Sequence, residues 1–151
     1  MDNVIQKARM GVSAVKIMAS AEMQQRTLFQ MMQVVVLSVL DYGLGLLTLS
    51  QTQVDRLERV QNEAMRAVLG CTRDTPIVTM RFLLDLPSIK SRHKIAQVKE
   101  YFKVANNDHH LLHQSLDNTK GRRIKRGKYW MAEAEGTLLR VCELEEVAVN
   151  G

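Results

Sequence analysis

Residues 50–70, SQTQVDRLERVQNEAMRAVLG, contain the strongest secondary-structure signal of this 151-residue chain. Ser50 followed three residues later by Gln53 is the pattern of a capping box, in which each side chain bonds the backbone amide of the other residue. Gly70 supplies the residue type that most readily adopts the left-handed conformation beyond a helix C-terminus. Between these signals, apolar residues at helical spacing predict one buried face: Val54, Leu57, Val60, Ala64, Ala67 and Val68.

The same periodicity continues on both sides of this helix. It predicts further helices at Val4–Met18, Gln24–Val39, Pro76–Leu84, Ile89–Ala105 and Tyr129–Val147. Thr75 is the expected N-cap of the third of these, with Pro76 as its first residue. Strand-like alternation and hairpin turns are absent from the sequence. The prediction is an all-α fold, an irregular bundle of about five helices followed by a basic linker and a C-terminal helix, with boundaries at 1–115, 116–128 and 129–151.

Two of these helices carry specific expectations about burial. The segment from Gln24 to Val39 is apolar on nearly every side, which is typical of a helix at the centre of a bundle, and its longest apolar run, Val34–Leu37, falls far short of the ~20 residues that a membrane span needs. The helix capped by Ser88 is expected to have one core side and one cationic side. Its core side would be Ile89, Ile95, Val98, Tyr101, Phe102 and Ala105, and its cations are Lys90, Arg92, Lys94, Lys99 and Lys103.

Charge is distributed unevenly along the chain. The formal net charge is +5, and six cations fall within nine positions: Lys120, Arg122, Arg123, Lys125, Arg126 and Lys128. Beyond Ala132 the sign reverses, because five glutamates face a single arginine. The two cysteines form no CxxC pair and no secretory signal precedes them, so we expect an intracellular protein, nuclear or cytoplasmic, without a disulfide framework.

No complete catalytic or metal centre is evident in the sequence. The candidates are isolated carboxylates at helix ends, a cysteine in a turn, three nearby histidines and an incomplete glycine pair: Asp41, Asp74, Asp85, Cys71, His109, His110, His113, Gly43 and Gly45. A carboxylate at a helix end commonly serves as a cap or turn residue, and the histidines lack a ligand set that completes a tetrahedral site. We therefore expect no enzymatic activity, no cofactor, no metal and no small-molecule substrate.

The basic run is the strongest functional feature. Cations on such a segment gain affinity for a phosphate backbone by releasing its counterions. Tyr129 and Trp130, directly after the run, have the side chains that stack on unpaired bases. The alternative is a solvated linker with Trp130 packed into the core, and nuclear import is a third use of the same residues.

The string from Leu40 to Gly70, with the stretch that follows it, resembles the segment after the polymerase palm in reverse transcriptases of jockey-like, non-LTR retrotransposons. The resemblance rests on Tyr-Gly after an apolar helix, on Leu-x-x-x-Gln-Asn-x-x-x-Arg in a long helix, and on Thr-Pro and Leu-Pro pairs before a basic helix. The matching residues are Tyr42, Gly43, Leu57, Gln61, Asn62, Arg66, Thr75, Pro76, Leu86, Pro87, Arg92 and His93.

The resemblance implies a helical thumb that holds a template-primer duplex while the palm performs the chemistry. Because the 151 residues contain no Tyr- or Phe-x-Asp-Asp, the expectation is a non-catalytic fragment that contacts RNA or an RNA-DNA duplex through the lysines and arginines of the Ser88-capped helix and of the basic run. The alternatives are a helical protein-interaction or oligomerisation module, with a protein partner on its helix faces, and a genomic relic without a selected function. No membrane is expected among the partners.

Overall fold

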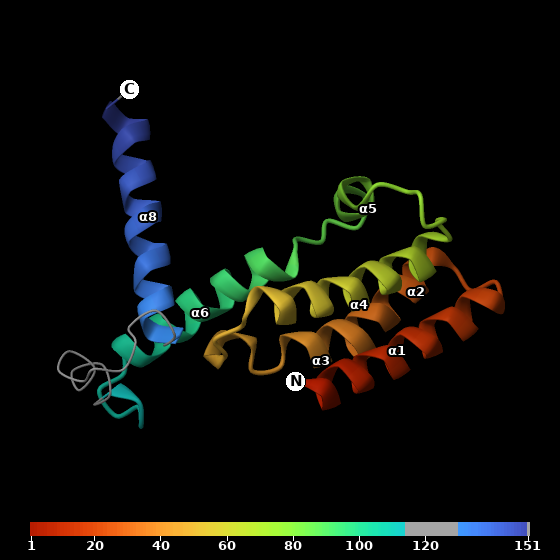
Figure 1. Cartoon of the computed structure of the whole chain (residues 1–151), viewed down its shortest axis with the longest axis horizontal. Helices are drawn as coiled ribbons and strands as arrows, with labels where there is room; N and C mark the ends of the chain where they lie inside the picture. The colour runs from red at the N-terminus through yellow and green to blue at the C-terminus, as the bar shows by residue number, and fades with distance from the viewer. Residues whose placement is uncertain (114–129, 151) are drawn as a thin grey trace. The chain divides into compact units, whose positions relative to one another are not determined.

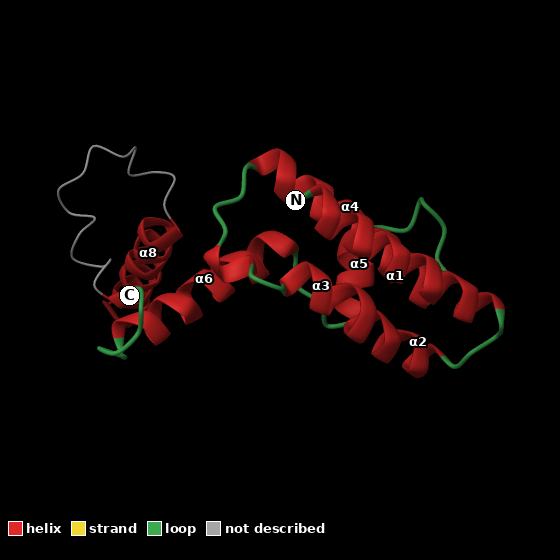
Figure 2. Ribbon diagram, turned by 90° about the horizontal axis from the view of Figure 1, so that it is seen from below, coloured by secondary structure: helices red, strands yellow, loops and turns green. Residues whose placement is uncertain are grey.

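The computed structural model describes residues 1–113 and 130–150, with the side chains of the last helix described as far as Leu144. Within these residues the chain forms helices and no strand, so the predicted all-α class is confirmed (Figure 2). The chain divides into two compact units. The first comprises residues 1–42 and 49–91, and the second comprises residues 43–48 and 92–151. This division differs from the predicted one at residue 115, and the predicted linker lies outside the described residues.

The first unit is built on two long helices, α1 (Asp2–Ser20) and α4 (Gln51–Leu69), which lie side by side and run in the same direction in Figure 1. Between them in sequence come α2 (Gln25–Met32), a π-helical turn (Gln33–Leu37) and α3 (Ser38–Asp41), which pack against α1. After α4 follow α5 (Ile77–Leu83) and the first residues of α6 (Ile89–Ala105). The largest fully buried side chains of this unit's core are Met32, Leu40, Leu57, Met65, Met80 and Ile89.

Helix α4 begins and ends where the sequence predicts. The Ser50 Oγ accepts a hydrogen bond from the Gln53 N–H at 3.3 Å, and the Gln53 Oε1 accepts one from the Ser50 N–H at 2.9 Å. At the other end Gly70 has a φ of 65° and its amide bonds the Arg66 carbonyl. Both capping interactions are local, which is why sequence alone located them.

A close approach at Gly11 lets α1 pack against the π-helical turn. A Cβ atom added at Gly11 would lie 2.5 Å from the carbonyl oxygen of Val35, which is backbone and cannot rotate away. Glycine is therefore the residue type that this contact requires. Hydrophobic periodicity predicted this helix at Val4–Met18 but does not indicate the need for a glycine at position 11.

The segment from α2 to α3 is less buried than predicted, because Val34 is exposed while Val36, Leu37 and Leu40 lie in the core. Among the described residues, the stretch Gln25–Leu46 is long and apolar enough to cross a membrane by length and composition, with 39% of its apolar window buried in the protein. The expectation that no stretch approaches that length counted only the uninterrupted apolar run. Core helices of soluble proteins meet the same criterion.

The second unit joins three stretches of chain: residues 43–48, α6 from Arg92 onward, and α8 (Trp130–Asn150). Its small core contains Val104, Trp130 and Met131. Gly43 has a φ of 70°, in the left-handed region, and follows the C-cap of α3, Tyr42. Gly45 lies so close to α6 that an added Cβ would stand 2.7 Å from the Ala96 carbonyl oxygen.

The predicted start of α5 is wrong by one residue. Pro76 has an extended ψ of 133° and forms the N-cap, so the helix begins at Ile77. Thr75 is therefore not the N-cap. A proline can occupy either position because its fixed φ suits both and it has no amide to satisfy.

Candidate nucleic-acid interface

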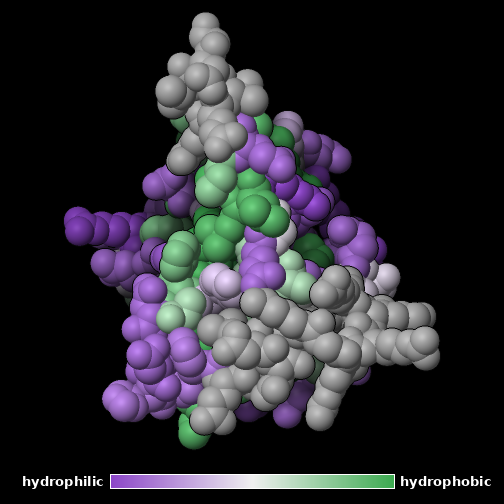
Figure 3. Space-filling view, turned by 90° about the vertical axis from the view of Figure 1, so that its left-hand side faces the viewer, coloured by the Kyte–Doolittle hydropathy of each residue, from purple (hydrophilic) through white to green (hydrophobic). Residues whose placement is uncertain are grey.

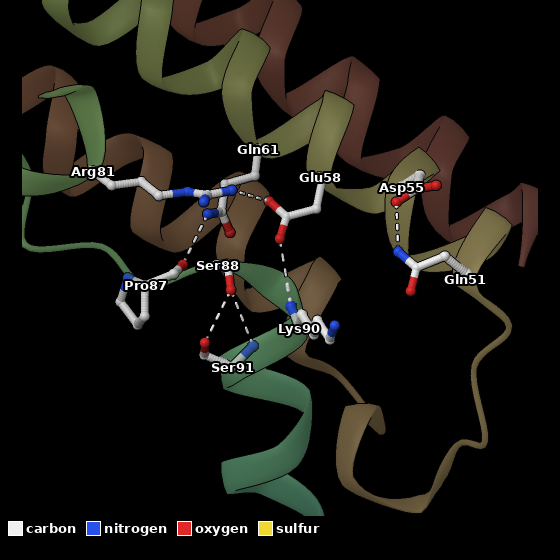
Figure 4. A network of polar contacts seen from close by, with 9 residues as sticks. All are labelled: Gln51, Asp55, Glu58, Gln61, Arg81, Pro87, Ser88, Lys90 and Ser91. Atoms are coloured by element: carbon white, nitrogen blue, oxygen red, sulfur yellow. Dashed lines mark hydrogen bonds and ion pairs between the residues drawn. The ribbon is translucent and has the colours of Figure 1, made fainter. Parts of the chain in front are cut away.

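Helix α6 starts at a polar junction with α4, and this junction fixes the first turn of the helix that carries the predicted cations (Figure 4). The Ser88 Oγ accepts a hydrogen bond from the Ser91 N–H at 3.1 Å, which confirms Ser88 as the N-cap. A second free amide of this first turn, that of Lys90, donates to the Glu58 Oε1 at 3.4 Å. A carboxylate at a helix N-terminus also has a favourable interaction with the helix dipole.

Glu58 and Gln61 of α4 hold the chain on both sides of this junction (Figure 4). The other Glu58 oxygen accepts a hydrogen bond from the Arg81 Nη2 of α5 at 2.6 Å. Gln61 is completely buried, and its Nε2 donates to the Pro87 carbonyl oxygen at 3.0 Å. Two of the motif residues, 26 positions apart in the chain, are thus brought together. Glu58 is not among the predicted site residues, although its i,i+3 spacing from Gln61 places the two on one side of α4.

The cations of α6 lie on two sides of the helix rather than on one. Arg92, Lys99 and Lys103 follow one line at spacings of seven and four, whereas Lys90 and Lys94 follow another. All four lysines are exposed and Arg92 is partly buried. Lys103 pairs with Glu100 on the same helix at 2.5 Å, while Lys94 and Lys99 form no ion pair with a described residue. The prediction of a single cationic side is therefore wrong.

The predicted core side of α6 is also partly wrong. Ile95 and Phe102, seven residues apart and hence on one line, are 50% and 48% exposed. The positions buried instead are polar, His93 and Gln97, on the line that starts at Ile89. The cations border the exposed pair on both sides, with Lys94 on one side and Lys99 on the other. Ile95 and Phe102 are called the α6 strip below.

The side chains of His93 and Gln97 are buried where both form hydrogen bonds with the backbone carbonyl of Leu47, in the 43–48 segment. The His93 Nε2 lies 2.7 Å from the Leu47 carbonyl oxygen, and the Gln97 Nε2 donates to the same oxygen at 3.2 Å. Gln97 also donates to the Glu133 Oε2 of α8 at 2.6 Å. These bonds tie three distant stretches of the second unit together. Their signal in the sequence is the spacing of four from Ile89 to His93 to Gln97.

A second contact between α6 and α8 involves a titrating group. The Tyr101 hydroxyl donates a hydrogen bond to the Glu135 Oε1 at 3.0 Å. Burial, together with this bond to a carboxylate, raises the pKa of Tyr101 above its ordinary value. The Tyr101 hydroxyl is therefore a hydrogen-bond donor from α6 to α8.

The basic run, Lys120, Arg122, Arg123, Lys125, Arg126 and Lys128, lies outside the described residues, as does Tyr129. Trp130 belongs to α8 and is buried against Val104 and Met131 in the core of the second unit. Of the two alternatives for this side chain, packing is the one found, and stacking of Trp130 on a base is excluded by its burial.

The other motif residues are dispersed. Tyr42 is 85% exposed, and Asn62 is buried with no hydrogen-bond partner for its Oδ1 among the described residues. Arg66 is partly buried with a carbonyl that receives the amides of Gly70 and Cys71 at the end of α4. Thr75 and Pro76 lead into α5. Their positions serve helix ends and packing, and they do not form a common site with α6.

The remaining chemical candidates have structural partners. The His113 Nδ1 lies 2.8 Å from the Val104 carbonyl oxygen, and the His110 Nδ1 accepts the Leu112 amide at 3.2 Å. Cys71 is partly buried against the core of the first unit. Within the described part of the chain, no three His, Cys, Asp or Glu side chains are grouped so that they could hold a metal ion.

Neither a family model, nor a curated protein, nor a solved structure matches this chain.

Proposed function

We propose that this chain is a non-catalytic module, derived from the thumb of a retrotransposon reverse transcriptase, that binds RNA or an RNA-DNA duplex through its phosphate backbone. The proposal rests first on the exposed lysines of α6 and second on the resemblance around Leu40 to Gly70. Contacts from lysine and arginine to phosphates fix a protein on a duplex without reading sequence.

The line Arg92, Lys99 and Lys103 has dimensions that suit a duplex. Eleven residues of α-helix span roughly 16 Å at 1.5 Å per residue. Duplex DNA carries one negative charge per about 1.7 Å of its axis, so a helix of this length lies opposite several phosphates. Lys99 can therefore contact one phosphate and Lys103 the next, once Lys103 leaves its ion pair with Glu100.

The free protein carries an electrostatic cost that a bound phosphate would relieve. Lys99 and Lys103 are four residues apart on α6, and like charges at this spacing destabilise a helix by roughly 0.2–0.5 kcal/mol. Glu100 offsets this repulsion only at Lys103. A polyanion would neutralise both charges and release counterions at the same time.

The test is the salt dependence of binding to a fluorescent RNA-DNA hybrid, measured between about 50 and 200 mM salt. Each phosphate contact contributes roughly 0.7–0.9 to the slope of log K against log salt concentration. Changing Arg92, Lys99 and Lys103 to glutamine should therefore reduce the slope by roughly two to three units if all three side chains contact phosphates.

Two further variants distinguish a local interface from net charge. A matched control changes three exposed cations of the first unit, Lys7, Arg9 and Arg26, to glutamine and should leave most of the slope intact. The third variant replaces the six cations of the basic run by alanine. The resulting decrease in the slope measures how much of the salt dependence comes from the basic run. The proposal is rejected if the intact chain shows no salt-dependent binding, and its α6 part is rejected if the control lowers the slope as much as the α6 variant does.

A further inference from the structure

Beyond Ala134, the described part of α8 presents apolar side chains to solvent, unlike the start of the helix, and residues 138–144 are called the exposed half of α8 below. Trp130, Met131 and Ala134 are buried, but farther along Leu139 is 65% and Leu144 is 70% exposed. Five of the seven residues from position 138 to position 144 are apolar: Leu138, Leu139, Val141, Cys142 and Leu144. A helix with apolar residues on most of its circumference is normally covered. Figure 3 shows apolar surface along α8 below the grey atoms at its end.

The same chain's α6 cannot cover this half of α8. Leu144 lies ten residues beyond Ala134, the last buried contact, which corresponds to about 15 Å along the helix axis. Within the second unit α8 extends away from α6 over this length (Figure 1). Within the described part of the second unit, no element covers this half of α8.

Charge selects the partner. Glu133 and Glu135 bond α6 of the same chain, but from position 138 onward the sequence carries Glu143, Glu145 and Glu146 against one cation, Arg140. Pairing of two such segments would therefore bring like charges together. The α6 strip has the opposite character, with Ile95 and Phe102 half-exposed between Lys94 and Lys99. Apolar residues bordered by glutamates thus match apolar residues bordered by lysines.

We propose that the exposed half of α8 in one copy of this chain docks on the α6 strip of a second copy, and that the second copy does the same in return. A two-fold reciprocal arrangement makes the α6-α8 contact twice, which gives a larger buried area than one short strip supplies. The interaction is a property of the second unit and does not depend on the proposed binding of nucleic acid.

The test is complementation between two disabled variants of the full chain, with the molar mass measured by analytical ultracentrifugation from about 1 to 100 µM. One variant carries Ile95→Asp and Phe102→Asp, and the other carries Leu139→Asp and Leu144→Asp. Each should weaken self-association by at least roughly tenfold, because a buried anchor residue commonly contributes more than 1 kcal/mol. A 1:1 mixture should form heterodimers, since one intact α6 strip and one intact α8 remain.

Controls keep the result specific. Leu111→Asp alters an almost fully exposed leucine of the loop after α6 and should leave the dimer unchanged. Because all the substituted side chains are exposed in the single copy, far-UV circular dichroism should show unchanged helix content. A wild-type chain that stays monomeric, or an α6-strip variant that still dimerises, would overturn the proposal, and the second result would assign the contact to α8 pairing or to another surface.

Discussion

At the scale of single residues, two glycines in helices are expected to respond in opposite ways to the same substitution. Gly11→Ala would place a Cβ 2.5 Å from the Val35 carbonyl oxygen, and overpacking of this kind typically costs about 1–3 kcal/mol. Gly136→Ala in α8 meets nothing within 4 Å and should gain up to about 1 kcal/mol from helix propensity. Urea denaturation of both variants measures the difference. Equal shifts in the two midpoints would mean that α1 and the π-helical turn do not approach as closely as described.

The hydrogen bond from Tyr101 to Glu135 is expected to make the folded protein less stable at alkaline pH. Folding raises the pKa of this phenol above the ordinary value of 10.0. The stability that the protonated phenol contributes to the folded state is therefore complete below pH 10, and it is lost as the pH rises through the folded-state pKa. Tyr101→Phe removes the titrating group and its bond to Glu135. The variant should be less stable than the wild type at pH 7, and the gap should narrow above pH 10. Thermal unfolding followed by circular dichroism across this range measures the gap, and a constant gap would contradict the assignment.

At the scale of helices, Glu58 is expected to be the most sensitive charged residue of the first unit's polar junction. Glu58→Gln leaves the Arg81 guanidinium, whose side chain is only 28% exposed, without its carboxylate. Loss of a partner by a partly buried charged group typically costs about 1–3 kcal/mol. The unfolding free energy from urea titration should fall by that amount.

An exposed ion pair provides the matched control for Glu58. Arg56 of the same helix pairs with Asp2 at 2.6 Å and lowers the pKa of that carboxyl by its hydrogen bond, yet Asp2 is fully exposed. Solvent screens such pairs. Arg56→Gln should therefore leave the urea midpoint almost unchanged, and a loss as large as that of Glu58→Gln would remove the distinction between the two sites.

Helices were predictable from sequence where their signals are local. The capping box at Ser50 and the glycine at position 70 are satisfied within a few residues, so the limits of α4 follow from the sequence. The orientation of α6 depends on a contact across the chain, because His93 and Gln97 bond the Leu47 carbonyl, 46 and 50 residues away. The hydrophobicity pattern assigns Ile95 and Phe102 to the core, because it contains no information about hydrogen bonds to a distant backbone carbonyl.

At the scale of the whole molecule, the two proposals for α6 make a joint prediction. The lysines that border the α6 strip would serve both the phosphate backbone and the glutamates of a second copy. An excess of RNA-DNA hybrid should therefore shift the protein from dimer to monomer, as measured by ultracentrifugation with a label on the protein. Persistence of the dimer in the complex would mean that nucleic acid binds elsewhere, and the basic run would be the first surface to test.

For the candidate site, the sequence predicts which residues are charged and exposed but not how they are arranged around α6. Lysines at 90, 94, 99 and 103 are exposed as expected, because nothing else in the sequence is needed to keep a lysine in water. Their division between two sides of α6 depends on which line of the helix is buried, and that is fixed by the distant contacts of His93 and Gln97. The polar junction at Glu58 likewise joins residues that are 23 and 32 positions apart.

The path of the chain through the two units limits how they can be separated. The chain leaves the first unit after Tyr42, contributes residues 43–48 to the second, and returns at Leu49. No single cut yields both units intact, since a fragment beginning at Arg92 lacks the Leu47 carbonyl that His93 and Gln97 bind. A circular permutation or gene fusion that keeps both units must therefore leave residues 43–48 connected to both.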